Sequence, residues 1–155
     1  MGIDVNELQD HGEDLARFLV RYGAGLYVGE KDYKMRWPGT TTTVSGPLMF
    51  CVSMPEGSVL SVMSSRKEDQ IASARRSAEI IIDNLQGAKL AGAIIFDCVV
   101  RGVILQDDFH GAVDAMKEVL QVPVIGFETY GEFAMEMGQM TGHHNATTVI
   151  LAIPD

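Results

Sequence analysis

The stretch Ala91-Gly92-Ala93-Ile94-Ile95-Phe96 decides the fold, and Asp97-Cys98-Val99-Val100-Arg101-Gly102 follows it directly. Six small or apolar residues in a row predict a buried strand. A second apolar run, Val122-Pro123-Val124-Ile125-Gly126-Phe127, passes in the same way into Glu128-Thr129-Tyr130-Gly131-Glu132. Ligands of open α/β sheets bind beyond strand ends of this kind, because the sheet holds the position and the loops supply the groups. The sequence therefore predicts a site where these two strands end.

Helical patterns alternate with strands around this core. Ser65-Arg66-Lys67-Glu68 fits a capping box, and apolar residues then recur at helical spacing until Gly87. A second helix is predicted from Asp107 or Asp108 as the cap to the residues before Pro123. The apolar run from Thr147 to Ile153 predicts a last strand.

The N-terminal half has a different pattern. A helix is predicted from about Val5 to Tyr22, with Asp4 as its cap and Gly23 as its stop. Short runs separated by turn residues then predict antiparallel strands at Leu26–Gly29, Tyr33–Trp37, Thr41–Val44, Leu48–Val52 and Ser58–Met63. We therefore expect an α/β (α+β) fold: a single domain over residues 1–155 with a mixed β-sheet, an N-terminal helix, an antiparallel meander and strand-helix alternation in the C-terminal half.

Composition excludes several classes of partner. The chain has 155 residues, 46% of them hydrophobic, and a formal net charge of -9. That charge disfavours nucleic acid and anionic membrane surfaces, since both would repel it. The two cysteines, Cys51 and Cys98, lie in apolar runs and predict no disulfide framework. With no signal pattern and no run long enough to span a membrane, the sequence predicts a cytoplasmic protein.

Cys98 and Arg101 follow the first strand. A thiol reacts as its thiolate, and Arg101 would favour that form if the two side chains converge. The alternative is that Cys98 is a small buried hydrophobe. An arginine at this place can hold a ligand carboxylate or phosphate in a bidentate manner. Its alternative is a structural pair with Asp97 or Glu132.

Tyr130, Gly131 and Glu132 follow the second strand. Tyr130 offers a ring for stacking and a hydroxyl for hydrogen bonding, and Gly131 permits a close backbone approach. Glu132 suits an ammonium group, or acts as a general base if it is desolvated. The alternative is that Glu132 is a solvated loop carboxylate.

The loop over residues 136–144 is a candidate lid. Its last two residues, His143 and His144, and then Asn145 lie directly before the last strand. Adjacent residues at the start of a strand point to opposite faces, so the two histidines do not suit one metal ion. One histidine lining a pocket is the better interpretation. No nucleotide-binding loop, nucleophile elbow or metalloprotease motif is present, and we expect neither metal nor cofactor.

Three segments in this order resemble the C-terminal domain of the FIST proteins, the F-box and intracellular signal-transduction proteins. They are Phe96-Asp97-Cys98-Val99-Val100-Arg101-Gly102, the segment from Pro123 to Glu132, and His144-Asn145-Ala146-Thr147-Thr148-Val149. The most specific piece is Gly126-Phe127-Glu128-Thr129-Tyr130-Gly131-Glu132, and the resemblance is good from about Met63 onward.

The resemblance implies an intracellular sensory domain that acts beside signalling modules and binds small ligands such as amino acids. The residues that match the family pattern are Cys98, Arg101, Tyr130, Gly131, Glu132 and Asn145. The family's N-terminal domain has no counterpart in this chain, so a site between the two domains is not expected to be complete here. We expect that a separate signalling protein is needed to pass on the signal.

Three functional hypotheses follow. The first is a non-catalytic sensor of an amino acid or other small carboxylate, in which Arg101 holds the carboxylate, Glu132 the amine and Tyr130 packs on the ligand, while Asn145 or His144 closes the pocket. The second is a small enzyme with Cys98 as nucleophile and His144 or Glu132 as base. The third is an interaction module that binds a signalling partner through a strand edge or a methionine-rich loop, and the sequence leaves open whether copies of the chain associate.

Overall fold

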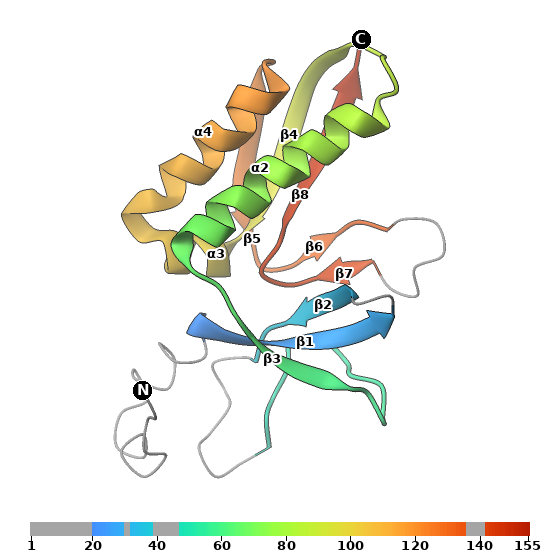
Figure 1. Cartoon of the computed structure of the whole chain (residues 1–155), viewed down its shortest axis with the longest axis vertical. Coiled ribbons are helices and arrows are strands. Elements are labelled where there is room, and N and C mark those ends of the chain that lie inside the picture. The colour runs from blue at the N-terminus through green and yellow to red at the C-terminus, as the bar shows by residue number, and fades with distance from the viewer. Residues whose placement is uncertain (1–19, 30–31, 39–46, 136–141) are drawn as a thin grey trace. The chain divides into compact units, whose positions relative to one another are not determined.

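The computed structural model describes residues 20–29, 32–38, 47–135 and 142–155 (Figure 1). The chain divides into two compact units, Met1–Ser64 and Ser65–Asp155. Helices and mixed sheets are both present, which confirms the predicted α+β class. The assignment of residues 1–155 to a single domain stays a prediction.

The first unit contains a three-stranded antiparallel sheet in the order β2-β1-β3. Its strands are β1 (Tyr22–Gly29), β2 (Asp32–Arg36) and β3 (Leu60–Ser64). β1 and β2 pair as consecutive strands, and β3 pairs with the other edge of β1. The predicted meander is therefore correct for the first pair of strands, while β3 follows β2 in sequence without pairing with it.

The prediction of a strand over Leu48–Val52 is wrong. Only Phe50 pairs, in one isolated bridge with Pro38. Pro47 and Pro55 flank the run and have no N–H to donate to a ladder, which limits pairing at both ends. The predicted strand over Thr41–Val44 and the predicted N-terminal helix up to residue 19 lie outside the described residues.

The second unit alternates strands and helices. Its elements are α2 (Lys67–Asn84), β4 (Leu90–Cys98), α3 (Val99–Leu105), η2 (Gln106–Asp108), α4 (Phe109–Leu120), β5 (Val124–Thr129), β6 (Glu132–Phe133), β7 (His143–His144) and β8 (Thr148–Pro154). β4 is the central strand of the order β5-β4-β8, parallel to β5 and antiparallel to β8. β6 and β7 form a separate two-stranded hairpin. Among the described helices, none is both long and apolar enough to cross a membrane.

Helix α2 begins one residue later than predicted. The N-cap is Arg66, not Ser65, and its backbone N–H donates to Asp69 Oδ2 at 3.0 Å. The Arg66 guanidinium binds the same carboxylate. Glu68 and Asp69 in the first turn also interact favourably with the positive end of the helix dipole. Only one half of the predicted capping box therefore forms, in which Asp69 accepts from the Arg66 N–H, because a guanidinium has no acceptor for a backbone N–H in return.

Helices α2 and α4 cover one face of the β5-β4-β8 sheet (Figure 1). Side chains alternate along a strand, so Ala93 and Ile95 of β4 face the helices. The buried core consists of Ala74, Ala78, Ala93, Ile95, Leu105, Ala112, Met116 and Leu120. Half of these residues are alanines, which allow the helices to pack closely against the strands.

Helix α3 was not predicted. β4 ends at Cys98 and α3 begins at Val99, so no loop separates strand from helix. The next helix, α4, begins after Asp108 as predicted and ends at Leu120, where Gln121 adopts a left-handed conformation with φ 52°. This direct passage from strand to helix places Arg101 on the helix side of the sheet.

Candidate functional site

The end of β4 distributes its polar groups over two faces of the sheet. Asp97 and Cys98 are consecutive strand residues, so their side chains point in opposite directions. Asp97 pairs with Thr148 across the ladder, and Cys98 pairs with Thr129. The helix-side cluster comprises Gln70, Ser73, Asp97, Arg101 and Thr148, and the far-side cluster comprises Cys98, Thr129, Glu132 and Thr147.

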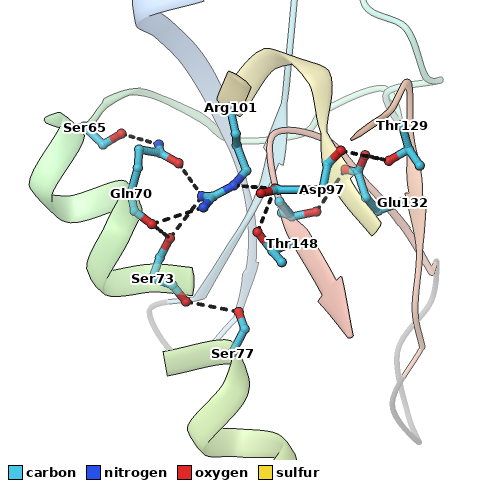
Figure 2. A network of polar contacts seen from close by, with 10 residues as sticks. Ser65, Gln70, Ser73, Ser77, Asp97, Arg101, Thr129, Glu132 and Thr148 are labelled. Carbon is cyan, nitrogen blue, oxygen red and sulfur yellow. Dashed lines mark hydrogen bonds and ion pairs between the residues drawn. The ribbon is translucent and has the colours of Figure 1, made fainter. Parts of the chain in front are cut away.

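Arg101 is the centre of the helix-side cluster (Figure 2). Its Nε donates to Asp97 Oδ1 at 2.6 Å, and its Nη1 donates to Gln70 Oε1 and to Ser73 Oγ. Its Nη2 donates to the Gln70 carbonyl at 3.1 Å. Only 2% of Arg101 is exposed. The guanidinium therefore joins the first turns of α2 to the end of β4, which is the structural pairing considered as the alternative to a ligand clamp.

Asp97 has two carboxylate oxygens with different surroundings. Oδ1 accepts hydrogen bonds from Arg101 and from Thr148 Oγ1, the latter at 2.8 Å. Oδ2 is buried and has no hydrogen-bond partner within the described part of the chain. Leaving a buried acceptor unsatisfied costs about 1–3 kcal/mol. Asp97 thus retains one acceptor position that a donor group can fill.

Glu132 is the centre of the far-side cluster, with 1% of its surface exposed. Thr129 Oγ1 donates to Oε1 at 2.6 Å (Figure 2). Thr147 Oγ1 donates to Oε2 at 3.1 Å. The Cys98 thiol is a third hydrogen-bonding neighbour. Within the described residues Glu132 makes no ion pair. Its buried carboxylate is therefore held by neutral donors, although buried charges in proteins are usually paired.

Cys98 is buried in this cluster, and its environment keeps it protonated. Burial raises the pKa of the thiol to about 11, and the neighbouring Glu132 raises it further against the lowering effect of nearby backbone N–H groups. The cause is that a thiolate would be desolvated and would lie beside a carboxylate. A thiol with this pKa is almost entirely protonated near neutral pH, which is the opposite of an activated nucleophile.

The two clusters together contain one buried positive group and two buried carboxyl groups. Arg101 is paired with Asp97, and Glu132 remains without a cation among the described residues. The clusters are connected, since Thr129 Oγ1 also lies 3.3 Å from the Asp97 carbonyl oxygen. In electrostatic terms the end of the sheet is suited to one further positive group.

The β6–β7 hairpin carries the remaining candidates. Tyr130, just before β6, is 91% exposed. A Cβ on Gly131 would lie 2.8 Å from His143 Nε2, so the absence of a side chain there lets the imidazole approach the backbone. His143 stacks on Phe133 with ring centroids 4.7 Å apart, and Asn145 Nδ2 lies 3.5 Å from His143 Nε2.

His144 has a different neighbour from His143. Its Nε2 lies 2.9 Å from the Ala134 carbonyl oxygen, within hydrogen-bonding distance. His143 and His144 thus contact different groups, as the alternation of side chains predicts. Most of the candidate lid, residues 136–141, lies outside the described residues.

The structure brings some predicted residues together and separates others. Cys98 and Glu132 share the far-side cluster, and Gly131 and Asn145 lie beside His143. Arg101 lies in the helix-side cluster with its donors bound to protein groups. The polar partners that sequence reasoning did not single out are Gln70, Ser73, Thr129, Thr147 and Thr148. Strand alternation was the available signal, since it assigns residues 97 and 98 to opposite faces.

The family profile described as the FIST C domain matches residues 5–135, which is most of the chain. No curated protein and no solved structure matches the chain significantly.

Proposed function

The chain belongs to the FIST C domain family, a family of sensory domains in signal transduction, and from this membership we propose that it binds a small ligand through an ammonium group. An amino acid is the simplest ligand of this kind. The proposed binding place is the far-side cluster at the end of β4, and binding involves no catalysis. The supporting observation is the buried Glu132 carboxylate, which has neutral donors and no ion pair within the described residues.

Glu132 is the residue that we expect to receive the ligand amine. The Thr129 and Thr147 hydroxyls are neutral, so they supply hydrogen bonds to the carboxylate but no opposite charge, whereas an ammonium group supplies both. An ammonium group that replaced the Thr147 hydroxyl, the more distant donor at 3.1 Å, would therefore improve the environment of the carboxylate.

The other candidates have supporting roles in this proposal. Arg101 fixes Asp97 rather than holding a ligand carboxylate, because its donors are bound to Asp97, Gln70 and Ser73. Tyr130 projects into solvent and offers a ring for the ligand to pack on. Gly131, His144 and Asn145 shape the hairpin beside it.

The cysteine enzyme is the weaker hypothesis. The pKa of Cys98 is raised to about 11 and its side chain is buried, so near neutral pH little thiolate is available for attack. The far-side cluster is better suited to recognise charge than to perform covalent chemistry.

The test is thermal unfolding with amino acids and, for each, the 2-hydroxy acid of the same side chain. A ligand that binds only the folded state at a hundred times its Kd adds about 2.7 kcal/mol, a shift of several degrees. We expect a shift with an amino acid and none with its hydroxy analogue, because only the amine supplies the missing positive charge. Glu132→Gln keeps the size and one acceptor but removes the charge, and we expect it to abolish the shift.

The matched control is Glu128→Gln, the same change in an exposed carboxylate at the end of β5. It should leave the shift intact. Equal shifts with amino and hydroxy acids, or a shift that persists in Glu132→Gln, would contradict the role of Glu132. The absence of a shift with every compound would contradict the proposal that the chain senses an amino acid.

A further inference from the structure

The β5-β4-β8 sheet has a second face that neither α2 nor α4 covers. Cross-strand pairing places Ile94 beside Ile125 and Leu151, and the next row again carries three apolar residues, one from each strand. We define the open face by Ile94, Phe96, Ile125, Phe127, Val149, Leu151 and Ile153. Helices α2 and α4 both lie on the opposite side (Figure 1).

The open face is exposed and strongly apolar. Ile125 is 70% exposed, Phe127 60%, Leu151 52% and Ile153 44%. Phe96 and Phe127 meet edge to face at 5.2 Å and form its centre. A sheet with apolar residues on both faces is typical of a middle layer that is packed on both sides. The open face therefore has the composition of an interface and not of a solvated surface.

We propose that the open face binds a second copy of this chain, sheet against sheet. Its side chains carry no charge and no hydrogen-bonding group, so the same patch on another copy complements it by packing alone. The four most exposed residues present on the order of 400 Å² per copy, and with the rim a pair buries about 1,000 Å² in total. That area is at the lower end for a specific interface and corresponds to a weak, reversible dimer.

The distribution of charge favours a second copy of the chain over a basic partner protein. The chain has a net charge of -9, but none of that charge lies on the open face. A basic partner would be recognised at acidic groups, and salt would weaken its binding. Two copies repel one another through their net charges, so screening by salt should strengthen their association.

The experiment is sedimentation equilibrium of the chain from about 1 µM to about 1 mM, the range that brackets weak complexes. We expect the mass to rise from one chain toward two, and to rise at lower protein concentration when salt is added. Ile125→Asp places a charge at the most exposed position of the face and should weaken association by at least about 10-fold. Leu151→Asp places a charge on the same face from strand β8 and should also weaken association.

Ile80→Asp is the matched control, because Ile80 is 46% exposed on α2, away from the open face. It should associate like the unchanged protein, and circular dichroism of each variant establishes that it is folded. A mass of one chain at every concentration would overturn the proposal. So would equal association of the Ile125 and Ile80 variants, or a complex that grows beyond two chains.

Discussion

The two faces of the β5-β4-β8 sheet are formed by the same three strands and have opposite surroundings. On one face Ala93 and Ile95 of β4 are buried under α2 and α4. On the other, their neighbours Ile94 and Phe96 lie in a layer whose outer members are exposed. Equal hydrophobicity along a strand therefore does not mean equal burial. The difference teaches that burial, and the stability that comes from it, is concentrated on the helix side of the sheet.

The largest expected effect is the loss of the buried ion pair on the helix side. Arg101→Ala leaves Asp97 buried without its cation and should lower the free energy of unfolding by about 3–5 kcal/mol. Urea denaturation measures the change. Arg75→Ala is the matched control, because Arg75 pairs with Glu118 on the surface, where such a pair contributes about 0–1 kcal/mol. Similar losses in the two variants would mean that Arg101 does not join α2 to β4 as the structure shows.

A second comparison makes one substitution on each face. Ile95→Ala removes packing from the core and should cost about 2–4 kcal/mol, since part of the cavity remains. Ile125→Ala removes atoms that already contact water and should cost less than about 1 kcal/mol. Both are measured by urea denaturation at protein concentrations too low for association. Equal costs would show that the open face is covered within one folded chain.

Hydrophobic periodicity predicted the elements that form the packed face. The apolar run at residues 91–96, the helical spacing after Ser65 and the cap at Asp108 each correspond to an observed element, β4, α2 and α4. Local patterns suffice to predict these three elements because each of them buries one face against the others. Helix α3 was missed because it follows β4 without a turn residue and contains Gly102, which normally lowers helix propensity.

The position of the candidate site could be predicted, but its internal geometry could not. Sequence reasoning placed Cys98, Arg101 and Glu132 near strand ends, where they lie. It paired Arg101 and Glu132 as the two ends of one clamp, whereas the structure binds Arg101 to Asp97 and Glu132 to Thr129 and Thr147. Such partners depend on contacts between residues distant in sequence, for example Arg101 with Gln70, which no local pattern encodes.

The last prediction concerns the far-side cluster, at the end of the open face where Cys98 is buried. The folded protein raises the pKa of Cys98 from its ordinary value of 9.0 to about 11, mainly by burial. Below pH 9 the thiol is protonated in both folded and unfolded chains, so it adds no pH dependence. Between pH 9 and 11 only the unfolded chain releases the proton, and the free energy of unfolding falls by at most about 1.4 kcal/mol per pH unit, or about 2–3 kcal/mol in total.

Cys98→Ala should therefore reduce the alkaline loss of stability, measured as the difference in urea midpoint between pH 8 and pH 11 at constant ionic strength. Cys51→Ala should not, because Cys51 is exposed in the folded chain and does not share the burial of Cys98. Other groups titrate in the same range, and the two cysteine variants share all of them, so the comparison isolates Cys98. An equal alkaline loss in both variants would mean that the thiol is solvated in the folded chain. The far-side cluster would then lack the dry surroundings on which the proposed selectivity of Glu132 for an ammonium group depends.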